Sequence, residues 1–173
     1  KHDYLAYFNK GVTLYQQKKY TQSSEALQQC ALINPYYSSA HYFLGNSFLE
    51  QGKPVQAMLC YCTYLMVSPK GKYLSKIVSK LNAIADAKDD IVFKVDANKN
   101  NGSDNFEQAQ EILLSKVALD TKYKLKTSLE DKIVRQLQVV LEKIEFINVD
   151  KSFAMQYYVP LFKQAFAKNF EEF

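Results

Sequence analysis

The sequence predicts an all-α protein: a short α-solenoid of two clear repeats and a third repeat with an insertion, followed by helices that pack at its C-terminal end. Two observations predict this fold. Gly11 and Gly45 lie 34 residues apart, and so do Pro35 and Pro69. Apolar side chains around these residues recur at helical spacing. A fixed period of this length is typical of repeat architectures.

The two clear repeats cover residues 4–37 and 38–71. Gly11 and Gly45 occupy the same position in them, and Gly45 lies inside a stretch whose apolar spacing is helical. A glycine inside a helix costs about 1 kcal/mol relative to alanine, so it usually has a packing or functional reason. We expect both glycines to lie where two helices touch. The spacing around Gly45 does not match a phosphate-binding P-loop.

This pattern resembles the tetratricopeptide repeat, a 34-residue helix–turn–helix unit. The resemblance covers residues 4–69, and Lys10, Cys30 and Tyr64 depart from the family's usual leucine and alanine. It implies that small residues let paired helices approach closely and that a proline ends the second helix. It also implies that the first helix of each repeat lines a concave groove that binds a protein or peptide.

A third repeat is expected over residues 72–123, because about three repeats are needed to bury a continuous core. Residues 72–88 carry apolar side chains at helical spacing, and residues 106–123 align with the second helix of the first repeat. Between them we expect an insertion at about residues 90–105. The repeats would then span residues 1–127.

The insertion is expected to be a loop. Its β-branched start, residues 91–95, favours extended chain, and the polar stretch over residues 94–104 is typical of a mobile surface loop. Asp96 and Glu107 sit at the ends of a partial EF-hand pattern, but glycine is missing from the sixth place, which is Asn101. That place needs a glycine for the sharp turn, so no metal site is predicted.

Residues 128–173 are expected to form a helical cap. Ser128, three residues before Asp131, suits a helix start, and the stretch 129–147 is amphipathic. Pro160 must kink a helix or open one. Aromatic residues then recur every four positions, and we expect them to lie mostly in the core. They are Tyr158, Phe162, Phe166 and Phe170.

Composition excludes several classes of function. The net charge of +4 is spread along the chain, and 21 of its 22 basic residues are lysine. This is not the clustered footprint of a nucleic-acid-binding protein. The longest apolar run, residues 57–67, is too short to span a membrane. Three cysteines cannot form a full disulfide framework, and we expect buried thiols.

No catalytic, cofactor-binding or metal-binding residue is predicted, and we do not expect an enzyme. His2 lies near the start, and His41 stands where the family packs an aromatic residue. No nucleophile or orienting carboxylate accompanies either one. We expect a soluble protein; a removed targeting segment before Lys1 fits the missing methionine as well as an internal start does. The compartment and the oligomeric state are left unassigned.

The repeat register of the resemblance places ten residues along the groove, which would be aromatic and apolar at one end and basic at the other. A peptide or helix with an apolar anchor and an acidic end would fit it. The residues are Leu5, Phe8, Val12, Tyr15, Tyr42, Asn46, Leu49, Tyr73, Lys76 and Lys80.

Two alternatives concern the same groove. Residues 128–173 could fold back and fill it, which would make the protein a structural module for a larger assembly. A clamp for the C-terminal carboxylate of chaperones would need lysine, asparagine and arginine at five groove positions. Those positions hold Phe8, Val12, Phe43, Tyr73 and Ile77, so this kind of recognition is excluded.

Overall fold

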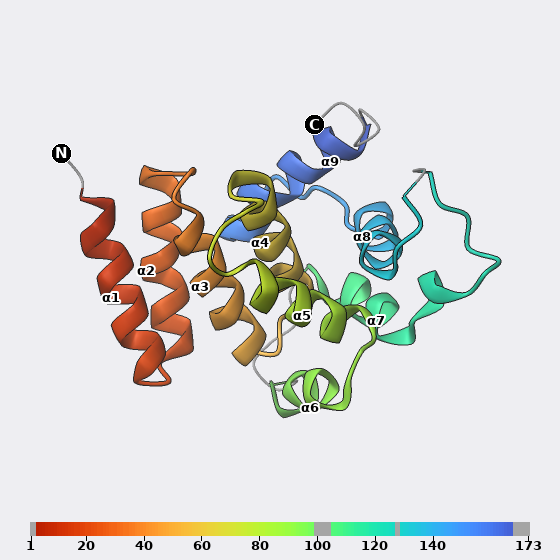
Figure 1. Cartoon of the computed structure of the whole chain (residues 1–173), viewed down its shortest axis with the longest axis horizontal. Coiled ribbons are helices and arrows are strands. Elements are labelled where there is room, and N and C mark those ends of the chain that lie inside the picture. The colour runs from red at the N-terminus through yellow and green to blue at the C-terminus, as the bar shows by residue number, and fades with distance from the viewer. Residues whose placement is uncertain (1–2, 99–104, 127–128, 168–173) are drawn as a thin grey trace.

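The computed structural model describes residues 3–98, 105–126 and 129–167. Within these ranges the chain forms helices and no strand, which confirms the predicted all-α fold. The N-terminal half is a row of helices that follow one another in space, as in a helical-repeat solenoid (Figure 1). They are α1 (Tyr4–Gln16), α2 (Tyr20–Ile33), α3 (Ser38–Glu50) and α4 (Pro54–Val67).

The two repeat glycines lie at helix–helix contacts, as expected. A Cβ atom on Gly45 would come 2.6 Å from the Tyr61 ring, and one on Gly11 would come 2.5 Å from Cγ of Leu27. Neither distance is possible for a real side chain, so α1 can approach α2, and α3 can approach α4, only at a glycine. Ser23 then ties the repeats together, because its hydroxyl donates to the Gly11 carbonyl at 2.8 Å and lies 2.9 Å from Oγ of Ser47.

Helix α4 is buried on every side except in its last turn. All residues from Pro54 to Tyr64 are buried, and a helix of this kind must be surrounded by other elements. It packs against α3, and also against elements that follow it in the chain. These are α5 (Leu74–Ala85), α7 (Glu107–Ser115) and the π-helix η3 (Ala154–Tyr158).

The expectation of extended chain at the start of the insertion is wrong, because residues 89–98 form helix α6 (Asp89–Asn98). Asp89 and Asp90 lie in its first turn, where negative charge favours a helix, and Ile91 and Val95, one turn apart, are both buried. This local pattern outweighs the β propensity of the segment. Residues 99–104 of the expected loop lie outside the described residues.

The third unit departs from a simple helix pair. Helices α5 and α7 both contact α4, and α8 (Lys132–Lys143) packs against both of them. The Gln136 side chain of α8 donates to the carbonyl oxygens of Ala85 at 2.9 Å and Leu113 at 3.1 Å, the ends of α5 and α7. A third repeat over residues 72–123 therefore stays a prediction.

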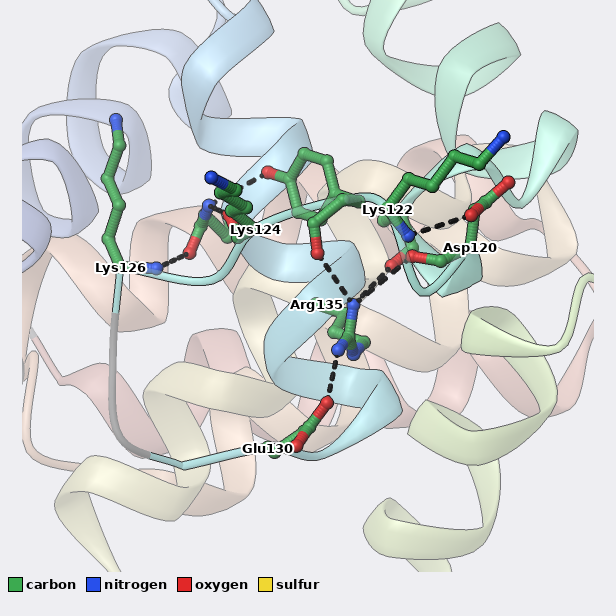
Figure 2. A network of polar contacts seen from close by, with 9 residues as sticks. Asp120, Lys122, Lys124, Lys126, Glu130 and Arg135 are labelled. Atoms are coloured by element: carbon green, nitrogen blue, oxygen red, sulfur yellow. Dashed lines mark hydrogen bonds and ion pairs between the residues drawn. The ribbon is translucent and has the colours of Figure 1, made fainter.

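The only arginine of the chain holds an irregular segment against α8 (Figure 2). The Arg135 guanidinium donates to the carbonyl oxygens of Ala118 at 3.3 Å, Asp120 at 3.4 Å and Tyr123 at 3.0 Å, and it pairs with Glu130. The planar guanidinium suits several acceptors at once. The short helix η2 (Val117–Leu119) and the chain after it are thus fixed beside α8.

The start of α8 and the position of Pro160 agree in part with the predictions from the sequence. The N-cap of α8 is Asp131, whose carboxylate accepts from the Ile133 amide at 2.7 Å; Ser128 lies outside the described residues. Pro160 follows the π-helix η3 and lies in the first turn of α9 (Val159–Ala167). A proline has no N–H to donate and crowds the carbonyl four residues earlier, and a wider π turn accommodates both effects.

Tyr158 and Phe162 are buried, as predicted for the aromatic stripe. The Tyr158 hydroxyl lies 2.8 Å from Nδ1 of His41, and a hydrogen bond joins it to the Cys60 thiol. His41 Nε2–H donates to the Pro35 carbonyl at 2.8 Å, so Nδ1 is the acceptor for Tyr158. One buried chain of hydrogen bonds therefore fastens η3 to α3 and α4.

Replacing Gly45 by leucine should lower the free energy of unfolding by about 1–3 kcal/mol, because the new side chain overpacks the contact with Tyr61. Asn9→Leu is the control, since it adds the same side chain to an exposed position on α1. Chemical denaturation of both variants measures the difference. An unchanged midpoint for Gly45→Leu would contradict the assigned repeat register.

Stability should fall in mild acid because of His41. Burial lowers its pKa below the ordinary value of 6.5, against the opposing effect of the Pro35 carbonyl. The folded state therefore favours the neutral ring, and this contribution is complete above about pH 6.5 and is lost as the pH drops below it. Between pH 7.5 and 5.5 we therefore expect the free energy of unfolding to fall.

The control for this prediction is His41→Gln, which removes the titrating group but leaves every carboxylate in place. Thermal melting at the two pH values should show a smaller difference for the variant than for the native chain. Equal differences would mean that other groups cause the acid effect.

Candidate functional site

Six half-buried aromatic rings lie together across α1, α3 and the chain before α5. Five pairs of these rings meet edge to face, with centroids 5.0 to 6.1 Å apart. Edge-to-face pairs of this kind are each worth about 0.5–1.5 kcal/mol beyond the area they bury. We call this group the aromatic band; it consists of Tyr4, Phe8, Tyr15, Tyr37, Phe43 and Tyr73.

The predicted groove residues of the first repeat remain accessible. Leu5 is 42% exposed, and Phe8, Val12 and Tyr15 are half-buried. The rings of Phe8 and Tyr15 both contact the ring of Phe43 edge to face, so α1 and α3 present one continuous aromatic face. Burial, and then the nearby Glu50 carboxylate, raise the pKa of Tyr15 to about 12, so its hydroxyl stays a hydrogen-bond donor at neutral pH.

The predicted groove residues of the second repeat are buried, which differs from the expectation of an accessible lining. Tyr42, Asn46 and Leu49 are only 7%, 5% and 4% exposed. The ring of Tyr42 stacks on Tyr73 with centroids 4.0 Å apart, and Oδ1 of Asn46 accepts from the Tyr61 hydroxyl at 2.8 Å. The chain entering α5 therefore covers Tyr42, and α4 covers Asn46.

The basic end of the predicted groove lies on α5, and α6 adds to it. Lys76 is exposed and Lys80 is half-buried; burial, and then the nearby Lys94, lower the pKa of Lys80. Lys94 of α6 is itself paired with Glu50 at 2.5 Å. At the other side of Tyr73, Nζ of Lys72 lies 4.9 Å from the ring centroid.

The C-terminal segment lies on another side of α3. Tyr157 and Tyr158 lie against the ring of His41, whereas the aromatic band includes Phe43. Residues two apart on a helix point in nearly opposite directions, because each residue advances by about 100°. The rings of η3 therefore contact α3 away from the aromatic band.

Sequence reasoning missed three members of the band. Tyr4 and Tyr37 were not assigned to the groove, and Phe43 was considered only as a position of the chaperone clamp. Tyr37 precedes α3 and meets both Tyr4 and Phe8, at 5.1 and 5.0 Å. The signal was the high count of 13 tyrosines and 11 phenylalanines, which the register alone could not place.

The described residues show no other site of a familiar kind. No group of three metal-ligating side chains occurs among them, and none of the helices they form is long and apolar enough to cross a membrane. The three cysteines are buried as free thiols, as expected. Burial raises the pKa of the Cys60 and Cys62 thiols, which keeps both protonated.

Comparison with known proteins agrees with the repeat assignment. A family model described as tetratricopeptide repeat matches residues 4–37, the same bounds as the first predicted repeat. The curated proteins give no significant match, and the solved structures give none either. Tetratricopeptide repeats generally mediate protein–protein interaction, and helical-repeat folds are typically non-catalytic. The chain therefore contains a tetratricopeptide repeat at residues 4–37.

Proposed function

We propose that this protein is a non-enzymatic interaction module, or scaffold, that binds a peptide or helix of another protein along the aromatic band. The observation that carries the proposal is the band itself. Its rings pack edge to face against one another, yet each remains partly exposed. Aromatic side chains that are already held in place lose little entropy on binding, and tyrosine is frequent among residues that dominate binding energy.

The first repeat supplies the anchor site. Phe8 and Tyr15 lie on the same side of α1, and Phe43 lies between them from α3. An apolar side chain of the ligand would rest on these rings. Leu5 and Val12 extend the apolar surface along α1.

Lysines beside the band favour a ligand with an acidic end. Lys76 is exposed on α5, and Lys72 lies over Tyr73. Charges at the rim of an interface mainly speed the encounter of the two partners. We therefore propose that the acidic end approaches α5 while the apolar anchor docks at α1.

The second candidate function is a structural module whose groove is closed by its own chain. The burial of Tyr42, Asn46 and Leu49 favours this candidate, because these positions would line an open groove. In this case the closure comes from the chain entering α5, and the α1 part of the band would serve only to stabilise the repeats.

Surface plasmon resonance separates the two candidates, with the full chain immobilised and the partner recovered by pull-down as analyte. Phe8→Ala should speed dissociation about thirtyfold, because a buried aromatic anchor can carry about 2 kcal/mol. Lys76→Glu should slow association and weaken its dependence on salt.

Phe146→Ala is the matched control, since Phe146 is an exposed aromatic residue of the chain after α8, outside the band. It should leave both rates unchanged. If Phe8→Ala and Lys76→Glu behave like this control, the aromatic band is not the binding site and the structural module is favoured.

A further inference from the structure

A second groove lies between α1 and α2, with a volume of about 410 Å³. On α1 it is formed by Tyr7, Lys10 and Leu14, which the helical spacing places about 120° around the helix from Phe8 and Tyr15. It is therefore separate from the aromatic band. Its lining residues are Tyr7, Lys10, Leu14, Gln22, Glu25, Ala26 and Gln29.

The repeat register relates this groove to an occupied one. A shift of 34 residues carries Tyr7 to His41 and Ala26 to Cys60. His41 and Cys60 are the two residues that hold the Tyr158 hydroxyl. In the second repeat, Tyr158 thus fills the space between α3 and α4 that corresponds to the open groove between α1 and α2.

The equivalence extends to the whole lining. Every residue that corresponds to a lining residue of the α1–α2 groove is buried in the second repeat, with an exposed fraction of 6% or less. The same position on two repeats is thus covered in one and open in the other. The covered set is His41, Leu44, Phe48, Gln56, Leu59, Cys60 and Thr63.

We propose that the α1–α2 groove binds a helical segment of a partner protein, which inserts an aromatic side chain between Tyr7 and Ala26 as Tyr158 does between His41 and Cys60. This second interaction surface does not depend on the aromatic band. A partner bound here and a peptide bound along the band would occupy different sides of α1.

The charges of the groove specify the partner further. Lys10 replaces the buried Leu44, and Glu25 replaces the buried Leu59. Neither Lys10 nor Glu25 has an ion-pair partner among the residues that the structure describes. A segment that places an acidic side chain opposite Lys10 and a basic one opposite Glu25 is complementary to the groove. Because Lys10 and Glu25 are charged, the groove suits a partner that binds reversibly. Tyr158, in contrast, stays buried in the groove of the second repeat.

The groove also continues into the interface of the C-terminal segment. Gln29 of the groove lies one turn before Leu32 on α2, and Leu32 is 53% exposed. Tyr36 follows with 82% exposure, and burial, and then the nearby Tyr36, raise the pKa of Tyr157. Two exposed side chains, Leu32 and Tyr36, thus lie between the open groove and η3.

The test uses a synthetic peptide with the sequence of residues 150–167, which already fits the equivalent groove of the second repeat. It is added to the full-length, ¹⁵N-labelled chain, and amide shifts are followed by NMR. We expect shifts grouped around Tyr7, Ala26 and Gln29, with a Kd below about 1 mM. A control peptide that carries alanine in place of Tyr158 should bind at least tenfold more weakly.

Protein variants locate the binding independently. Tyr7→Ala should weaken peptide binding at least tenfold, and Phe8→Ala, on the face of α1 that carries the aromatic band, should leave it unchanged. The double variant Gln22→Arg, Gln29→Arg fills the groove from two lining positions exposed to solvent, so it should also abolish binding if the fold is intact.

The proposal is overturned if no shifts appear in the groove, or if they centre on His41 and Cys60 because the peptide replaces the chain's own segment. It is also overturned if Tyr7→Ala and the double arginine variant bind the peptide as the native chain does. Loss of partner binding at the aromatic band in Phe8→Ala would not affect this result, so the two binding surfaces can fail separately.

Discussion

The structure depends on the need to cover helix α4 on all sides. Its run of apolar residues is too short for a membrane and too apolar for a surface, so other parts of the chain must enclose it. The first two repeats cover only the side of α4 that faces α3. The remaining surface is covered by α5, α7 and η3, which come from three later parts of the sequence. The irregular C-terminal half can be understood as the cover that this helix requires.

The same need explains why several polar groups buried by the C-terminal half are paired, although Oε1 of Gln136 is buried without a hydrogen-bond partner among the described residues. Bringing η3 onto α4 buries a hydroxyl, an imidazole and a thiol, and a buried polar group without a partner costs free energy. Cys60, Tyr158, His41 and the Pro35 carbonyl satisfy one another in a single series. Gln136 donates to backbone carbonyls at the ends of α5 and α7, and Arg135 donates to a carbonyl in the segment after η2. These contacts fix where each covering element lies.

The sequence was most informative where contacts are local or periodic. The glycine spacing predicted the contacts of Gly11 and Gly45, and the four-residue period predicted the burial of Tyr158 and Phe162. It failed at residues 89–98, where the acidic first turn and the pair Ile91 and Val95 outweighed β propensity. For the candidate site it placed Phe8 and Tyr15 but not the stacking of Tyr42 on Tyr73, because that contact depends on how the chain enters α5. The open α1–α2 groove could be recognised only after Tyr158 had been seen in its counterpart.

The hydrogen bond between His41 and Tyr158 joins residues 117 positions apart, and this separation has a consequence for the order of events during translation. Cys60 leaves the ribosome 98 residues before Tyr158, a delay of about 5 to 20 s at the usual rates of synthesis. Through that interval one apolar side of α4 has no native cover. The nascent chain would then be most prone to aggregate, or most dependent on a chaperone, after the repeats have formed and before the last helices emerge.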